Sequence, residues 1–286
     1  MYLYAFERKP KRQYIFWEEG DDPAQLERFA QENKVYELFF MGKTPFFSAK
    51  TELSFPADLK IESIKSIEIA NSDLQDYSFL YCFPNVKELH LSSNVNKYQL
   101  NLHCLPNLRA AYISYWSKGI EGLFDHKKLK TLHLGEYGGA KLNIPSQNKV
   151  LTQLAIHDSK VEDISDCVNL VNLKHLYLEL LPRLKDISWV TALKKLVDLD
   201  FTYCKKIADL IPTIGELEQL QELGFFDMGE IESIKEVKNL VNLKKIRIIG
   251  NTKIRDGKVA FLFSMEKLKK IDARSYKHYD EKSLSW

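Results

Sequence analysis

Residues 173–179, with the sequence LKHLYLE, carry the pattern that decides the fold. Their apolar residues follow the phrase L-x-x-L-x-L, in which Ile, Val, Phe or Ala can replace Leu. Successive copies of this phrase start 21 to 25 residues apart through most of the chain. The ten copies begin at Ile64, Val86, Leu108, Leu129, Leu151, Leu173, Leu196, Leu220, Leu243 and Leu268. A fixed apolar phrase with this period indicates a repeat architecture.

Within one copy, Leu176 and Leu178 alternate with His175, Tyr177 and Glu179. Side chains on a strand point to opposite faces in turn, so the two leucines are predicted to be buried and the other three to point outward. A single strand cannot bury its apolar face alone, but a neighbouring repeat stacked beside it can. The pattern therefore predicts an α/β solenoid: a leucine-rich repeat horseshoe of about ten repeats with a parallel, concave sheet.

The second half of each repeat must return the chain to the start of the next strand. Val161, Ile164, Val168 and Leu170 show the roughly helical apolar spacing that these return segments carry. Because the segments are short, we expect 3₁₀ turns or helices of one to two turns on the outer side of the solenoid.

The segments NLVNLKHLYL (169–178) and NLVNLKKIRI (239–248) resemble the 22-residue leucine-rich repeats of internalin-like bacterial proteins. The resemblance covers about residues 64–276. It implies the solenoid fold but names no function, because such repeats are general interaction scaffolds. The family usually has Asn, Cys or Thr three residues after the last leucine of the strand, where the side chain satisfies backbone groups at the bend. Here that position holds Asn94, Cys204 and Asn251 as expected, Ser72 and Ser159 as weaker substitutes, and Trp116, Tyr137, Leu181, Met228 and Tyr276 as departures that predict irregular bends.

Residues 1–60 do not fit the repeat and are predicted to form a small α+β cap, with residues 61–286 forming the solenoid and its closing segment. The cap is expected to contain strands at 2–6, 13–17 and 35–40, a helix opened by Asp22 and Pro23, and a turn at 42–45. Leu26, Phe29 and Ala30 would form the apolar stripe of the helix. A cap is needed because a solenoid end exposes an apolar edge; the alternative is a separate recognition domain rich in aromatic residues.

Composition and charge favour a soluble protein. The 286 residues are 45% hydrophobic with a net charge of +2, which gives no support to bulk nucleic-acid binding. No signal-peptide pattern and no apolar stretch of about 18–20 residues is present, so we expect a cytoplasmic protein with no membrane span. Cys82 and Cys104 are 22 residues apart and are predicted to stack as small core residues in adjacent repeats, although a disulfide or metal site is the alternative.

The sequence contains no recognisable catalytic motif, and no catalytic residue, metal site or cofactor is assigned. The glycine-rich loop at 135–141 follows a strand, but its spacing is wrong for a phosphate loop, so a simple turn is expected. His133, His157 and His175 lie on three successive strands. They occupy different heights on those strands, whereas metal ligands must converge on one point.

The outward strand positions and adjoining bends predict a surface for a protein partner. It is aromatic and His-rich at first, then acidic, then basic at Lys245, Arg247 and Lys270. Aromatic side chains dominate interface centres, and the acidic zone should attract a partner with a basic patch. The predicted partner-binding residues are Tyr112, Tyr115, Trp116, His133, His157, His175, Tyr177, Glu179, Asp198, Asp200, Tyr203 and Phe226. A routine polar face with strand-favouring aromatic residues is the plain alternative.

These features together favour a non-enzymatic protein–protein interaction module, either an antitoxin-like immunity protein or a regulatory adaptor. The competing hypothesis is an enzyme or nucleic-acid-binding protein that uses the His/Asp groove or the N-terminal head. The head contains no histidine, which weakens that hypothesis.

Overall fold

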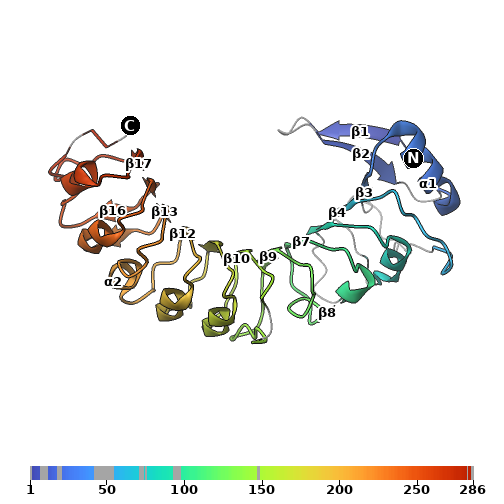
Figure 1. Cartoon of the computed structure of the whole chain (residues 1–286), viewed down its shortest axis with the longest axis horizontal. Helices are drawn as coiled ribbons and strands as arrows, with labels where there is room; N and C mark the ends of the chain where they lie inside the picture. The colour runs from blue at the N-terminus through green and yellow to red at the C-terminus, as the bar shows by residue number, and fades with distance from the viewer. Residues whose placement is uncertain are drawn as a thin grey trace, which may run out of the picture. The chain divides into compact units, whose positions relative to one another are not determined.

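The computed structural model describes residues 2–6, 12–17, 21–41, 55–70, 74, 76–92, 98–146, 149–281 and 283–284 (Figure 1). The chain forms two compact units, Met1–Gly135 and Glu136–Trp286. The turn predicted at 42–45 and the bend residues Ser72 and Asn94 fall outside the described ranges.

The first unit contains one sheet with the strand order β1-β2-β3-β4-β5-β7-β9. The first pair, β1 with β2, is antiparallel, and the other pairs are parallel. These strands are β1 (Tyr2–Phe6), β2 (Arg12–Trp17), β3 (Glu37–Met41), β4 (Ser66–Ala70), β5 (Glu88–Ser92), β7 (Ala110–Ile113) and β9 (Thr131–Gly135). The other elements are the helix α1 (Pro23–Asn33), the 3₁₀ helices η1 (Ser78–Cys82) and η2 (Leu102–Cys104), and the small parallel pair β6 (Gln99–Asn101) and β8 (Gly119–Glu121).

The second unit continues the same pattern with an all-parallel sheet of order β10-β11-β12-β13-β15-β17. Its strands are β10 (Gln153–His157), β11 (His175–Glu179), β12 (Asp198–Thr202), β13 (Glu222–Phe226), β15 (Lys245–Ile249) and β17 (Lys270–Ala273), with a minor pair β14 (Glu230–Ile231) and β16 (Lys253–Ile254). The return segments contain η3 (Ser165–Asn169), η4 (Ser188–Ala192), α2 (Leu210–Ile214), η5 (Lys235–Asn239) and η6 (Ala260–Ser264). In this unit they lie on the far side of the core from the strands, as predicted (Figure 1).

The leucine-rich repeat solenoid is confirmed. Within the described ranges, a strand of the main sheet begins two residues after the first residue of each of the ten apolar phrases. That first residue is buried in every phrase. The inward positions then stack in register, with Leu176 beside Leu154 and Leu199. Each fully buried leucine contributes about 1.5–3 kcal/mol relative to an exposed one, so the repeated stack supplies the core.

The bends at the strand ends are bound to one another by buried side chains. Ser159 accepts a hydrogen bond from the backbone N–H of Tyr137 at 2.9 Å, and Cys204 N–H lies 3.3 Å from the Met228 sulfur. Thr252, which is fully buried, accepts from the N–H of Met228 at 3.0 Å. Ser159 and Thr252 therefore satisfy backbone N–H groups of the preceding bends, and Met228 does so although it departs from the residue types that the resemblance implied.

Two bend assignments were wrong by one residue. Ser117, not Trp116, is the buried residue after β7, and its hydroxyl accepts from the N–H and donates to the carbonyl of Tyr98. Thr252, not Asn251, is the buried residue of the bend after β15, where its hydroxyl donates to Phe225 O at 3.2 Å. The sequence register could not show this shift, because it depends on the local backbone path.

The N-terminal elements continue the sheet of the first unit. β3 pairs with β4 in parallel, and the ring of Trp17 packs 5.2 Å from Phe55. Asp22 caps α1 by accepting from the N–H of Ala24, with Pro23 in the first turn, as predicted. Leu26 and Ala30 of the predicted stripe are buried, whereas Phe29 is only half-buried. The assignment of residues 1–60 as a cap stays a prediction.

Tyr279 and Asp280 hydrogen-bond back to residues 254–260, while the role of the tail as a closing segment stays a prediction. The hydroxyl of buried Tyr279 accepts a hydrogen bond from Ile254 N–H at 2.8 Å, and Asp280 accepts from the N–H groups of Val259 and Ala260 at 2.8 Å each. The bonds to Asp280 satisfy donors at the start of η6, and the bond to Tyr279 satisfies one at the end of β16.

The four cysteines are free. Cys82 and Cys104 end the equivalent helices η1 and η2, as their spacing predicted, but Cys104 is only half-buried.

Candidate interaction surface

The outward side chains of the repeat strands form what we call the strand face of each unit. Burial alternates along β12: Leu199 and Phe201 are buried, and Asp198, Asp200 and Thr202 are half-buried. All twelve predicted partner-binding residues are half-buried or exposed, on the strand faces or at the adjoining bends. The predicted alternation is confirmed, while partner binding by these residues stays a prediction.

The strand face of the first unit contains a ladder of rings. His90, Tyr112 and His133 occupy equivalent positions on β5, β7 and β9. The rings of His90 and Tyr112 are stacked with centroids 4.2 Å apart, and Tyr112 meets His133 edge-on at 4.6 Å. Glu88 holds the ladder at one end, with its carboxylate 2.6 Å from His90 Nε2. The aromatic zone is therefore a packed row rather than a set of separate contacts.

Tyr115 and Trp116 lie at the bend after β7 and do not join this ladder. The carbonyl of Tyr115 accepts a hydrogen bond from the Tyr98 hydroxyl at 2.8 Å, and the N–H of Trp116 donates to Gly135 O at 3.1 Å. Both residues are half-buried. Their backbone groups stabilise the bend, and their side chains remain partly exposed beside the strand face.

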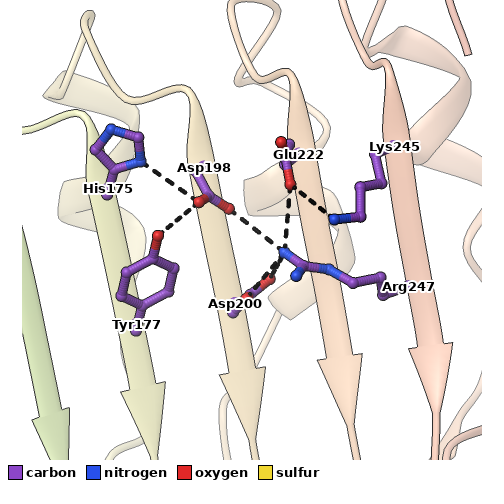
Figure 2. Close-up of polar contacts among 7 residues, drawn as sticks. All are labelled: His175, Tyr177, Asp198, Asp200, Glu222, Lys245 and Arg247. Carbon is purple, nitrogen blue, oxygen red and sulfur yellow. Dashed lines mark hydrogen bonds and ion pairs between the residues drawn. The ribbon is translucent and has the colours of Figure 1, made fainter. Parts of the chain in front are cut away.

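The strand face of the second unit carries a polar network around Asp198 (Figure 2). The Tyr177 hydroxyl donates to Asp198 Oδ2 at 2.6 Å, and His175 Nδ1 lies 3.4 Å from the same oxygen. Arg247 Nη2 lies 3.7 Å from Asp198 Oδ1 on the other side. We call these residues, together with Asp200, Glu222 and Lys245, the carboxylate network.

Arg247 is the centre of the carboxylate network. It starts on β15 and reaches across β13 to Asp200 on β12, where Nη2 donates to both carboxylate oxygens at 2.9 and 3.0 Å (Figure 2). The same nitrogen lies 3.6 Å from Glu222, whose other cation, Lys245, is at 3.3 Å. Only 20% of the Arg247 side chain and 15% of the Asp200 side chain are exposed. This ion pair is therefore partly desolvated, and its loss would leave a charge without compensation.

Gly224 makes this long reach possible. It sits between Asp200 and Arg247 in the strand register and faces the same way. A Cβ atom at Gly224 would collide with the Asp200 carboxylate and the Phe226 ring. Because strands are about 4.7–4.9 Å apart, side chains two strands away meet only when the residue between them leaves room.

We expect Gly224→Ala to lower the free energy of unfolding by about 1–3 kcal/mol, because the added methyl must displace Asp200 or Phe226 from a packed position. Urea unfolding of both proteins measures the change. Gly138→Ala is the matched control, since a Cβ at Gly138 would meet no atom within 4 Å. An equal loss in the two variants would show that Gly224 does not hold the network open.

Burial and charge set the protonation of the network. Burial raises the pKa of Asp200 to about 6; Arg247 opposes the rise, and Asp198 and Glu222 add to it. Asp200 is therefore still ionised at neutral pH, but its pKa lies closer to neutral pH than the pKa of an exposed carboxylate does. Burial, followed by the hydrogen bond to Asp198, raises the pKa of Tyr177 well above its ordinary value, so the hydroxyl keeps the proton that it donates.

The remaining predicted residues of this unit lie around the network. His157 is placed beside Glu179 in the strand register, not beside His175, so the predicted difference in height is confirmed. The Phe226 ring lies 5.4 Å from the Arg247 guanidinium carbon. Tyr203 is in the bend after β12, with its ring 5.4 Å from Lys205 Nζ.

Within the described ranges, no group of three or more His, Cys, Asp or Glu side chains is placed to hold a metal ion. No helix within these ranges has the length and apolar character needed to cross a bilayer.

Sequence reasoning missed the connection between the acidic and basic zones. It treated Asp198 and Asp200 as one zone and Lys245 and Arg247 as another, but the structure joins them in one network. The available signal was Gly224, a glycine at an outward strand position between a strand with carboxylates and a strand with cations. A glycine inside a strand often marks a close approach of other groups.

No family model matches the sequence, and no curated protein matches it. Among solved structures, the internalin InlF of Listeria monocytogenes aligns with a TM-score of 0.56 at 20% sequence identity, over 84% of this chain and 67% of that chain. The internalin InlC2 of the same bacterium aligns with a TM-score of 0.47 at 18% identity, over 74% of this chain and 81% of that chain. A leucine-rich repeat protein of Leptospira interrogans aligns with a TM-score of 0.48 at 16% identity, over 87% of this chain and 80% of that chain. At this identity, the likeness to InlF concerns the fold.

Proposed function

We propose, from the premise that this chain is a leucine-rich repeat protein resembling the internalin class, that it is a non-enzymatic module and binds a protein partner. The proposed site is the strand face of the second unit. Solenoids of stacked repeats present extended surfaces that serve binding, and function must then be argued from the surface itself. The observation that carries the proposal is the carboxylate network.

The network keeps the surface acidic and ordered. On the outward positions of β10 to β17, the carboxylates are Glu179, Asp198, Asp200, Glu222 and Asp272, and the cations are Lys245, Arg247 and Lys270. Five carboxylates and three cations leave a net charge of −2 on this face. The internal ion pairs hold Tyr177 and Asp198 in place before any partner arrives, which reduces the entropy lost on binding. A partner with a basic patch would complement this surface.

Two biological roles fit such a surface. An antitoxin-like immunity protein would cover the active site of a toxic enzyme, and a regulatory adaptor would hold its partner without blocking it. The two roles differ in one measurement: an immunity protein inhibits the activity of its captured partner at one-to-one stoichiometry, whereas an adaptor leaves that activity unchanged.

The competing enzyme hypothesis would use His175 and Asp198 as an acid–base pair. Their 3.4 Å contact is longer than a normal hydrogen bond between such groups, and Tyr177 takes the same carboxylate oxygen at 2.6 Å. The carboxylate is thus engaged in holding the surface together, and this geometry favours binding over catalysis.

The proposal is tested by capturing a partner with the full chain as bait, identifying it by mass spectrometry, and measuring its affinity by calorimetry. We expect the double variant Tyr177→Ala, Glu222→Lys, which we call the face variant, to weaken binding at least tenfold, because it removes an aromatic contact and reverses a charge. Val241→Ser is the control, since Val241 is 60% exposed on a return segment. Unchanged affinity in a face variant that is folded by circular dichroism would exclude this face as the site.

A further inference from the structure

The bends of the second unit share an unusual backbone conformation. The residue immediately after each of the strands β10, β11, β12, β13 and β15 has a positive φ, between 46° and 72°. We call this row of residues the rim. It consists of Asp158, Leu180, Tyr203, Asp227 and Gly250.

The residue types along the rim suit this conformation unequally. Glycine and aspartate are well tolerated at positive φ, so Asp158, Asp227 and Gly250 fit the bend. Leu180 and Tyr203 have φ values of 52° and 53°, in a region that bulky side chains seldom occupy. The repeat geometry requires the conformation, but it does not require these two side chains.

Packing does not explain the two residues either. Leu180 is 38% exposed and Tyr203 is 42% exposed. They occupy equivalent positions in neighbouring repeats: Leu180 N–H donates to Thr202 O at 2.8 Å, and Tyr203 N–H donates to Phe226 O at 3.0 Å. Two adjacent repeats therefore present large apolar side chains to solvent from a backbone that disfavours them. Strained residues of this kind cluster at binding sites.

Charge around the two residues indicates what they meet. Asp158 and Glu179 are exposed, and within the described ranges their carboxylates form no ion pair. Asp227, on the other side, accepts a hydrogen bond from Asn251 N–H at 2.9 Å. Lys205 lies over the Tyr203 ring, with its Nζ 5.4 Å from the ring centroid, so this ring already binds one cation.

We infer that the rim is a docking site for a cationic segment of the protein partner. An apolar side chain of that segment would pack between Leu180 and Tyr203. Its flanking Lys or Arg residues would pair with Asp158 and Glu179. The inference rests on the proposed function and deepens it, because it places the partner's anchoring contact at the rim and names its chemistry.

A peptide titration tests the chemistry without knowledge of the partner. The probe is a fluorescent peptide with the sequence Lys-Arg-Lys-Trp-Leu-Lys-Arg-Lys, and its matched control has Ser-Ser in place of Trp-Leu. We expect the full chain to bind the probe at least tenfold more tightly than the control peptide at moderate salt. Equal binding of the two peptides, or no binding of the probe, would overturn the inference.

The double variant Leu180→Asn, Tyr203→Asn tests the residues, because asparagine suits positive φ and keeps the bend. We expect it to lose the preference for the probe while its thermal unfolding midpoint stays equal or rises. A retained preference would contradict the inference, and a lowered midpoint would show that the two residues serve the fold instead.

The face variant separates this inference from the proposed function. If the captured partner loses affinity for the face variant and keeps it for the rim double variant, the strand face is the site and the rim inference is wrong. If the partner binds both variants as tightly as the wild type, both are wrong.

Discussion

Replacing Arg247 with leucine is expected to lower the free energy of unfolding at pH 7.5 by about 3–5 kcal/mol, the usual cost of removing one partner of a desolvated ion pair. The side chains of Asp198 and Asp200 are only 14% and 15% exposed, so neither can recover its hydration when the guanidinium is lost. Urea unfolding monitored by circular dichroism measures this loss.

The matched control is Lys245→Leu on the same strand. Lys245 pairs with Glu222, whose side chain is 42% exposed, and an ion pair of that kind contributes about 0–1 kcal/mol. A second control places Arg247→Leu in the Asp200→Asn background. Without the Asp200 charge, replacing Arg247 leaves one fewer buried carboxylate unpaired, so the loss in free energy of unfolding should be smaller. Equal losses for Arg247→Leu and Lys245→Leu would contradict the central role of Arg247.

Wild-type stability is expected to fall by about 3 kcal/mol between pH 4 and pH 6 relative to Asp200→Asn. Burial raises the pKa of Asp200 from 3.8 to about 6, so in this range the folded state binds more protons than the unfolded state. Stability then decreases as the pH rises, because each pKa unit of difference corresponds to about 1.36 kcal/mol. The contribution is present in full below pH 4 and is lost as the pH passes 6.

Unfolding of both proteins in urea at intervals from pH 4 to pH 8 measures this difference. The other groups that face Asp200 are Asp198, Glu222, Lys245 and Arg247, and they are common to both proteins, so subtraction removes most of their titration. The stability of the variant minus that of the wild type should rise up to pH 6 and then level off. A flat difference, or one that falls with pH, would show that burial does not dominate at Asp200.

Much of the fold could be predicted because the information is local in sequence. Leu176 and Leu178 are buried and Tyr177 points outward, since side chains alternate along any strand. The same phrase, repeated at a near-constant period, can bury its apolar residues only by stacking copies. The bends were harder to predict: Ser117 and Thr252 are buried in place of Trp116 and Asn251, because the backbone path of each bend decides which residue turns inward.

The candidate site could be predicted as a set of residues but not as an arrangement. The outward side chains, from Tyr112 to Phe226, follow from the period of two along each strand. Arg247 reaches Asp200 across a neighbouring strand only because Gly224 leaves room and because its long, flexible side chain points that way. That the partner-facing candidates Leu180 and Tyr203 lie in a left-handed bend depends on the backbone path.

The sequence by itself thus determined the repeat, the alternation of buried and outward residues and the ten strands, because each of these depends on residues that are close along the chain. Only the tertiary structure decided which outward charges neutralise one another. The physical reason is that ion pairs form through space between strands more than 20 residues apart in sequence, where a single missing Cβ at Gly224 determines whether the two side chains can meet.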